Sequence, residues 1–267
     1  MYVLSILILL FLIYLWCLKG RTNHPDIAKL RNWNYAHRGL HDAHRPENSL
    51  SAFQAALDHG YGIELDLHLT KDGDLAVIHD SSLKRTAGAD VVVESLTVDE
   101  LKNYALLGSN EPIPMLSQVL QMYEGKAPLI VELKPMNNNH VALCEAACKQ
   151  LDEYNGLYCI ESFDPRCIRW LRKNRPDLIR GQLSENWLKT KSRMPWIVKV
   201  IMTYHISNVY TRPDFIAYKY ADRKTFGTQI CRKLWKIQGV SWTLRSMEDH
   251  QTATAEDWIP IFENFTV

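Results

Sequence analysis

Short apolar runs alternate with helical patterns along most of the chain. The runs that we interpret as strands are residues 34–36, 63–67, 75–78, 129–133, 157–160, 179–181, 215–218 and 240–242. Between the first two runs, Leu50, Phe53 and Leu57 recur on one face and predict a helix. Asn48 or Ser49 can cap its N-terminus. Eight strands that alternate with helices over about 235 residues predict an α/β fold of the closed (β/α)8 type, the TIM barrel.

The first segment departs from this alternation. Residues 2–18 carry no charge, and a helix of about 18 residues reaches roughly 27 Å, close to the thickness of about 30 Å of a bilayer's hydrocarbon core. A cleaved signal peptide begins with basic residues and ends in small ones, whereas this run does neither. We therefore expect a single, uncleaved transmembrane helix. The expected division of the chain is an anchor, a linker and a barrel domain at residues 1–20, 21–31 and 32–267.

The basic residues near this segment predict its orientation. Lys19, Arg21, Lys29 and Arg31 all follow the apolar run. Because positive residues are enriched on the cytoplasmic side of a membrane helix, we expect the barrel domain in the cytoplasm. The six cysteines contain no CxxC pair and are too sparse for a disulfide scaffold or a structural zinc site. This usage agrees with a reducing compartment.

The composition is that of a globular protein with a full core, with 46% apolar and 23% charged residues. Lys and Arg number 31 against 30 Asp and Glu, a formal net charge of +1. This balance gives no reason to expect a nucleic-acid partner, which needs a concentrated basic field. Basic residues do gather between Pro165 and Lys199, near Trp187 and Trp196. We interpret this cluster as a solvated helix face, with contact to anionic lipid as the alternative.

Acidic side chains gather where predicted strands end, which in such a barrel is the active-site face. Glu64 and Asp66 lie two residues apart on one strand and share a face. Two carboxylates about 6.5 Å apart repel by roughly 2.5 kcal/mol at an effective dielectric constant near 20, and a bound cation would remove this cost. Glu132 adds a third carboxylate, and three such ligands without cysteine favour one divalent ion, Mg²⁺ or Ca²⁺. The alternative is a set of structural ion pairs with Lys134 or an arginine.

Two histidines and two cations also follow predicted strands. His37 ends the first run and His79 the third. One neutral and one protonated imidazole can divide general-base and general-acid duty, although spacing alone favours two structural histidines. Arg38 and Lys134 are placed to hold an anionic oxygen, preferably that of a phosphate.

A series of short motifs runs from residue 34 to residue 134. They are Ala36-His37-Arg38-Gly39, Arg45-Pro46-Glu47-Asn48-Ser49, Glu64-Leu65-Asp66, Thr70-Lys71-Asp72-Gly73, His79-Asp80, Leu96-Thr97, Ile113-Pro114 and Glu132-Leu133-Lys134. In this order they resemble the glycerophosphodiester phosphodiesterase family. Weaker signals follow at Glu161-Ser162-Phe163 and Trp242-Thr243, so the resemblance covers nearly the whole body of the chain.

The resemblance implies a barrel enzyme that hydrolyses small-molecule glycerophosphodiesters to glycerol phosphate and an alcohol. The roles that it implies are metal ligands for Glu64, Asp66 and Glu132, an acid–base pair for His37 and His79, phosphate contacts for Arg38 and Lys134, and supporting positions for Glu47 and Trp242. The first nucleophile, a substrate hydroxyl or water, stays open. So do the identity of the metal and the oligomeric state.

Two other functions remain open. A lysophospholipase D-type enzyme would act on lysophospholipids at the membrane, and a non-catalytic, membrane-tethered barrel would keep the fold without turnover. The chain also departs from the family pattern, which often ends the last strand with Thr-Asp. Here Glu263 follows the apolar run 258–262, and we expect it to take the place of that aspartate.

Overall fold

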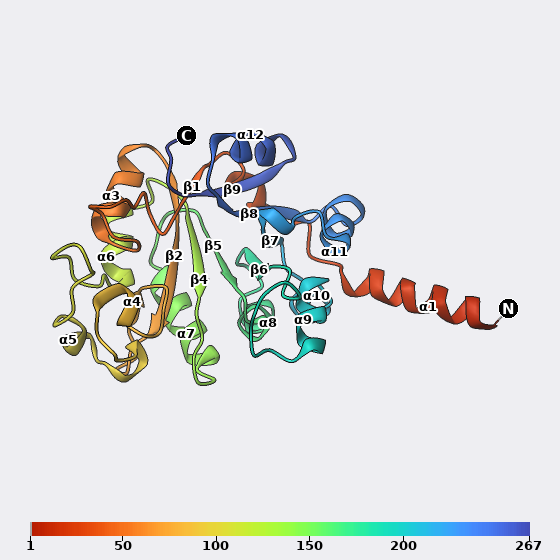
Figure 1. Ribbon diagram of the computed structural model, residues 1–267, viewed down its shortest axis with the longest axis horizontal. Coiled ribbons are helices and arrows are strands. Elements are labelled where there is room, and N and C mark those ends of the chain that lie inside the picture. The colour runs from red at the N-terminus through yellow and green to blue at the C-terminus, as the bar shows by residue number, and fades with distance from the viewer. Residues whose placement is uncertain (1) are drawn as a thin grey trace.

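Eight parallel strands close into a ring in the computed structural model, which describes residues 2–267 (Figure 1). Strand β1 pairs with β2 on one side and with β9 on the other, which closes the ring. The strands are β1 (Tyr35–His37), β2 (Gly62–Leu69), β3 (Leu75–Val77), β4 (Leu129–Leu133), β5 (Tyr158–Ser162), β6 (Arg180–Ser184), β7 (Phe215–Lys219), β8 (Gln238–Leu244) and β9 (Trp258–Phe262). The predicted TIM barrel is thereby confirmed.

Helical segments connect the strands and cover the outside of the ring (Figure 1). They are α1 (Tyr2–Cys17), α2 (Ile27–Leu30), α3 (Leu50–Asp58), α4 (Lys84–Ala87), η1 (Val93–Ser95), α5 (Val98–Leu101), α6 (Leu116–Tyr123), α7 (His140–Leu151), α8 (Pro165–Asn174), α9 (Trp196–Thr203), α10 (Asn208–Thr211), η2 (Tyr220–Asp222), α11 (Phe226–Gln229), η3 (Ile230–Leu234) and α12 (Met247–Ala255). The helix predicted from the apolar face of residues 50–57 is α3. Its N-cap is Ser49, whose side chain accepts a hydrogen bond from the Ala52 amide.

The alternation of side chains along β2 separates two environments. Ile63, Leu65 and Leu67 belong to the cluster that packs between the strands and the outer helices, including α3 and α7. Glu64 and Asp66 point the other way, into the barrel, because successive side chains of a strand face opposite sides. Burying the three apolar residues therefore fixes the inward direction of the two carboxylates.

The N-terminal ends of the strands are covered by the segment that we expected as a linker, residues 21–31. It contains α2, where Leu30 is fully buried with Tyr35, Ile130 and Phe215. The Tyr35 hydroxyl donates to the Leu30 carbonyl. These contacts fill one end of the barrel with apolar side chains and leave the opposite end for polar ones.

Strand β3 lies outside the ring, which corrects one of the eight predicted strands. It pairs antiparallel with β2 as the last strand of the sheet. The reason is the short turn at residues 70–74, since five residues can reverse the chain but cannot make the crossover that parallel pairing requires. The predicted run 240–242 is thus in the seventh strand of the ring, and the eighth is β9.

The long segment between β3 and α6 forms a small unit beside the C-terminal ends of β2 and β4. It contains α4, η1 and α5 and has its own apolar cluster, which includes Leu83, Val93, Leu101 and Ile113. Figure 1 shows α4 and α5 at the opposite end of the molecule from α1. This segment between β3 and α6 therefore has a core of its own.

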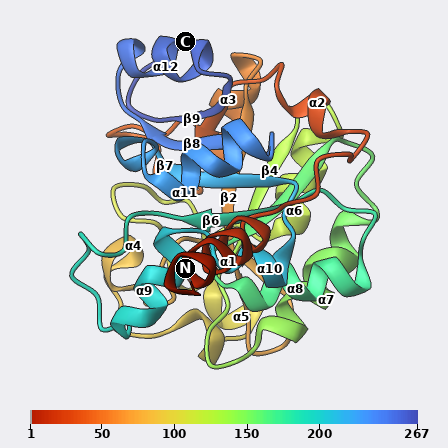
Figure 2. The same ribbon diagram turned by 90° about the vertical axis from the view of Figure 1, so that its right-hand side faces the viewer.

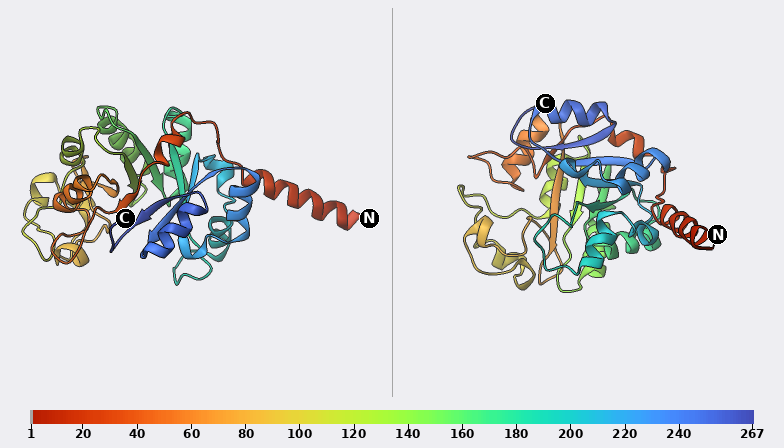
Figure 3. Two further views of the ribbon diagram at one scale, coloured as in Figure 1. Left: turned by 90° about the horizontal axis from the view of Figure 1, so that it is seen from above. Right: turned by 45° about the vertical axis from the view of Figure 1, so that its right-hand side comes forward.

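The first segment forms a helix, but the prediction of a transmembrane anchor at residues 1–20 is not supported. Met1 lies outside the described residues, and among residues 2–267 no helix combines the length and the apolar composition needed to cross a bilayer. Helix α1 has 16 residues, or about 24 Å at 1.5 Å per residue, against a hydrocarbon core of about 30 Å. The helix ends at Cys17, before the end of the predicted anchor, because Leu18 is buried in the barrel domain against Ile216, Cys231 and Ile237. Helix α1 projects from the body in Figures 1 and 3.

Candidate functional site

Three carboxylates converge at the C-terminal ends of neighbouring strands. Glu64 and Asp66 lie on β2 and Glu132 on β4, where Asp66 and Glu132 are register partners. One oxygen from each of the three lies within 4.8 Å of the others, and all three side chains are buried. At that separation each ionised pair repels by about 3.5 kcal/mol for an effective dielectric constant near 20. The cluster is therefore stable only with compensating positive charge.

Two cations already supply part of this charge. The Lys134 ammonium lies 2.7 Å from a Glu132 oxygen and 3.1 Å from an Asp66 oxygen. The Arg38 guanidinium lies 3.3 Å from the other Asp66 oxygen, and the Arg38 amide donates to Glu64 at 3.2 Å. The ion pairs of the alternative interpretation are therefore formed by Asp66 and Glu132. The pairing of Glu64 is weaker: among the described residues, its carboxylate accepts a hydrogen bond from the Arg38 amide and lies 3.9 Å from His37 Nε2, but it has no Lys or Arg ion-pair partner.

The ionisation of the three carboxylates differs. Burial raises the pKa of Glu64 well above its usual value, and repulsion from Asp66 and Glu132 adds to the rise. Burial also raises the pKa of Glu132, to about 7, against the opposing effect of Lys134. For Asp66, burial acts in the same direction but is outweighed by Lys134 and Arg38, so its pKa is lowered. One carboxylate is held ionised, and the other two resist ionisation unless further positive charge is present.

His37 ends β1 and is held by a residue from the far end of the chain. Its Nδ1 lies 2.6 Å from Oε2 of Glu263, and its Nε2 lies 3.9 Å from Glu64. Arg245 forms an ion pair with the other Glu263 oxygen. Burial lowers the pKa of His37, although the hydrogen bond to Glu263 opposes this. With the Nδ1 proton donated to Glu263, the neutral ring presents an unprotonated Nε2 to the site.

His79 belongs to a second chain of ion pairs. Its Nδ1 lies 2.6 Å from Asp80, and Asp80 pairs with Arg85. Arg85 also pairs with Glu47 at 2.7 Å, and Glu47 pairs with Arg38 at 2.9 Å. Burial lowers the pKa of His79 as well. Glu47 therefore joins the two sides of the site, from a position behind Arg38.

The loop after β1 is shaped to place Arg38 over Asp66. Gly39 has φ +82°, and a Cβ on it would meet the Ala52 backbone at 2.8 Å, so only glycine fits this approach. Asn48 has a positive φ of 56° and donates from its side chain to Asp66 at 2.9 Å. The motif residues from the first loop thus support the carboxylate cluster through Asn48 and Arg38.

A small cavity opens among these groups. Its lining is His37, Arg38, Glu64, His79, Glu132, Lys134, Glu161, Phe163, Leu183, Trp242 and Ile261. Seven of the nine residues expected from the sequence line it, while Asp66 and Glu47 lie behind the lining. Trp242 contacts Phe163 edge to face, with ring centroids 5.5 Å apart.

Sequence reasoning assigned no role here to Asn48, Asp80 or Glu161. Glu161 on β5 is the register partner of Glu132 and is almost fully buried. Burial raises its pKa well above the usual value, and repulsion from Glu132 adds to this. The available signals were the motifs themselves, since each of these residues lies beside or within a quoted motif.

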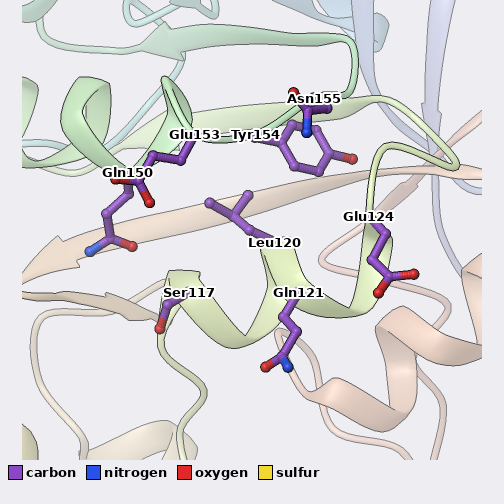
Figure 4. Close-up of a pocket in the computed structure, with 8 residues that line it drawn as sticks. All are labelled: Ser117, Leu120, Gln121, Glu124, Gln150, Glu153, Tyr154 and Asn155. Carbon is purple, nitrogen blue, oxygen red and sulfur yellow. The ribbon is translucent and has the colours of Figure 1, made fainter.

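A second, unrelated pocket lies on the outer helical layer, between α6 and the end of α7 (Figure 4). Its lining is Ser117, Leu120, Gln121, Glu124, Gln150, Glu153, Tyr154 and Asn155. It contains none of the carboxylates, histidines or cations described above. The barrel mouth is therefore the better candidate for chemistry.

Comparison with known proteins shows the family of the chain. The model of the glycerophosphoryl diester phosphodiesterase family matches residues 37–262. A glycerophosphodiester phosphodiesterase of Caldanaerobacter subterraneus subsp. tengcongensis is 35% identical over 158 residues, which cover 55% of this chain and 65% of that protein. The match therefore spans a little under two thirds of that relative's length.

Two further similarities are more limited. A lysophospholipase D of Rattus norvegicus is 34% identical over 105 residues, or 34% of this chain and 33% of that protein. The structure of an Oleispira antarctica phosphodiesterase, in complex with the product sn-glycerol-3-phosphate, superposes with a TM-score of 0.70 over 86% of this chain and 92% of that chain. At 18% identity this likeness shows the shared fold. Since the family model covers most of the barrel and its first-half motifs converge at the mouth, the chain belongs to the glycerophosphoryl diester phosphodiesterase family.

Proposed function

We propose that this protein is a metal-dependent phosphodiesterase that hydrolyses glycerophosphodiesters to glycerol phosphate and an alcohol. The observation that carries the proposal is the convergence of three buried carboxylates within 4.8 Å, between two histidines that each have a carboxylate partner. The family membership and the names of the relatives support the substrate class.

The carboxylate cluster fits a hard divalent cation. Glu64, Asp66 and Glu132 offer only oxygen ligands, which Mg²⁺ and Ca²⁺ prefer. Burial raises the pKa values of Glu64 and Glu132, and repulsion among the three acids adds to the rise, so the cluster has room for further positive charge. When bound there, such an ion would stabilise negative charge on the phosphoryl oxygens of the substrate.

The histidines would move the protons. Each has its Nδ1 hydrogen-bonded to a carboxylate, His37 to Glu263 and His79 to Asp80, so that Nε2 is the free nitrogen. Because burial lowers both pKa values, both rings are neutral at pH 7 before substrate arrives. One takes the proton of the attacking hydroxyl or water. The other must carry a proton to the departing alcohol, and a bound phosphate next to it would favour its protonated form.

Arg38 and Lys134 would hold the phosphate. Both line the cavity with their cationic groups, and both are fixed by Asp66, which remains ionised. Fixed cations in a water-poor cavity stabilise the phosphoryl transition state without reorganisation at the moment of reaction. Phe163, whose ring lies 5.8 Å from the Lys134 ammonium, limits the freedom of that cation on its other side.

The proposal is tested by assaying the purified full chain on glycerophosphodiesters with different alcohols. We expect EDTA to abolish turnover and Mg²⁺ or Ca²⁺ to restore it. We also expect His79→Ala to lower kcat by at least about a hundredfold, the usual scale for a lost acid–base group. His44→Ala is the matched control, because His44 is an exposed histidine of the loop after β1. Full activity in EDTA would refute the metal, and a near-normal rate for His79→Ala would refute the role of that histidine.

A lysophospholipase D-type activity is the second candidate. It is supported by the similarity to the Rattus norvegicus enzyme over part of the barrel. The two candidates share the proposed chemistry and differ in whether the substrate carries an acyl chain. Parallel rates on a soluble glycerophosphodiester and on the corresponding lysophospholipid in micelles separate them.

A further inference from the structure

We propose that α1 and the surface around its base form a seat for an anionic lipid bilayer, which binds the protein from one side. This surface, the lipid seat, consists of residues 2–17 together with the exposed apolar and basic residues of α9, α10, α11 and η3. It is separate from the catalytic mouth. The inference does not depend on the proposed function.

The first observation is the apolar surface of α1 itself. Every large apolar side chain from Tyr2 to Ile13 is between 47% and 82% exposed, and no residue of the helix is buried. Apolar positions surround the helix on all sides, so no single face distinguishes a packing partner such as another helix. A helix that is apolar on all sides and projects from a folded domain is typical of a site that binds a membrane or another apolar surface.

The second observation is a ring of exposed apolar side chains at the base of α1. Figure 2 looks along α1 and shows α9, α10 and α11 around it. On these elements and η3, the side chains that are at least half exposed are Trp196, Ile197, Tyr210, Phe226 and Leu234. Phe226 stacks on Tyr14 of α1, with ring centroids 6.3 Å apart. Aromatic side chains with this placement are typical of the boundary between hydrocarbon and headgroups.

The third observation is the charge of the same end of the molecule. Residues 185–236 contain eleven Lys or Arg and three Asp or Glu, and two of these acids, Glu185 and Asp222, form ion pairs with Lys219 and Lys189. Lys19 and Arg212 lie at the base of α1, over the rings of Trp235 and Trp16, and Lys233 is an exposed residue of η3. Within the described chain, no carboxylate forms an ion pair with any of these three residues. A basic surface beside an apolar anchor attracts anionic headgroups.

The opposite end of the molecule has the opposite charge. Residues 40–125, which include α3 to α6, contain fourteen Asp or Glu and five Lys or Arg. Figure 1 places these helices away from α1. Although the formal net charge is only +1, negative charge predominates at the end with α3 to α6 and positive charge at the end with α1. This separation would orient the protein with α1 toward an anionic membrane.

A second copy of the chain is the competing occupant of this surface. In a symmetric dimer, the same basic surface of each copy would face that of the other, so like charges would be brought together. Anionic lipid neutralises the same surface while it covers α1. The interpretation of this region as a solvated helix face leaves Trp196, Phe226 and α1 exposed to water without compensation. Charge complementarity therefore favours the bilayer.

The experiment measures binding of the full chain to vesicles of phosphatidylcholine with and without phosphatidylglycerol. We expect binding to the anionic vesicles to be stronger and to weaken as salt is added. The double variant Lys19→Glu/Lys233→Glu should bind these vesicles at least about tenfold more weakly. The matched control is Lys71→Glu/Lys149→Glu, which changes the net charge equally on exposed lysines away from the seat, and it should bind as the unmodified chain does.

Several outcomes would overturn the lipid seat. They are absence of vesicle binding, equal binding to neutral and anionic vesicles, and equal loss in the two double variants. Analytical ultracentrifugation without lipid tests the competing occupant, and a stable dimer that fails to bind vesicles would replace the proposal. The comparison of the two vesicle types uses the unmodified chain, so it remains decisive if a variant does not fold.

Discussion

His205 is a buried histidine that has no charged partner among residues 2–267. Its Nε2 lies 2.9 Å from the Thr228 hydroxyl, and its ring packs 4.9 Å from that of Tyr218. Burial alone lowers its pKa to about 3, whereas at His37 and His79 a carboxylate opposes the effect of burial. The His205 ring therefore stays neutral at pH values far below the usual pKa of histidine.

This protonation makes folding depend on pH. The unfolded chain protonates His205 below about pH 6.5, and the folded protein does not do so until about pH 3. The free energy of unfolding should fall as the pH falls through this window, by about 2 kcal/mol at pH 5 from this residue. Urea unfolding of the unmodified chain and of His205→Asn at pH 7 and pH 5 measures the difference. Asparagine suits the positive φ of 59° at this position.

The comparison isolates one residue, because all other titrating groups are common to both proteins. The variant should lose less stability between pH 7 and pH 5 than the unmodified chain. His44→Asn, at an exposed position, should retain the full loss. Equal losses in the unmodified chain and in His205→Asn would contradict the assignment.

At the scale of elements, α1 and the residue that follows it have different roles. No side chain of α1 is buried, whereas Leu18 is fully buried in the barrel domain. The Leu18 carbonyl also accepts a hydrogen bond from Asn208. Arg21 forms an ion pair with the buried carboxylate of Asp214 just before β7. The last turn of α1 already contacts the folded body through Tyr14 and Leu15, and full burial begins at Leu18.

Two deletions should distinguish these roles. Removing residues 2–12 should leave the free energy of unfolding of the barrel nearly unchanged, because that part of α1 is exposed. Removing residues 2–19 should lower it by about 1.5–3 kcal/mol, the scale for burying a leucine side chain. Urea unfolding measures both, and Leu18→Ala in the full chain should reproduce most of the second loss. If both deletions had equal effects, Leu18 would not belong to the core of the domain.

At the scale of the whole molecule, the lipid seat and the catalytic mouth lie at different ends. The chain enters the body from α1 next to Pro213 and Asp214, which immediately precede β7. The proposed catalytic groups lie at the C-terminal ends of the strands, toward the side where α4 and α5 are found (Figure 1). A protein bound to a bilayer through its lipid seat would thus turn its mouth toward water.

This arrangement predicts a preference among substrates. Enzyme bound to anionic vesicles should hydrolyse a soluble glycerophosphodiester as fast as free enzyme does, because the mouth remains open to water. The bound enzyme should hydrolyse a lysophospholipid held in the same vesicle more slowly than it hydrolyses the soluble substrate. The headgroup of this lysophospholipid lies on the side of α1, away from the mouth. Rates on both substrates with a fixed amount of vesicle provide the measurement. Faster hydrolysis of the embedded lysophospholipid would contradict this orientation.

Much of the site could be predicted because its parts are local in the sequence. The spacing of Glu64 and Asp66 on one strand determines that both face the barrel interior, once Leu65 faces the helices. The position of Glu132 at the end of a buried strand places it at the same face. By contrast, the partner of His37 is Glu263, which is 226 residues away, and only the closing of β9 against β1 brings the two together.

The alternation of strands and helices, the inward direction of the carboxylates and the family motifs could be recognised from the sequence alone, because they depend on periodicity and on neighbours along the chain. Which strands form the ring, where α1 ends and which acids hold the histidines depend on the folded structure. β3 was misplaced because an apolar run shows that a strand forms but not which strand it pairs with. Leu18 was assigned to a membrane because an apolar side chain packs equally well against lipid or a protein core. Both choices depend on contacts between segments far apart in the chain, and these exist only after the barrel has closed.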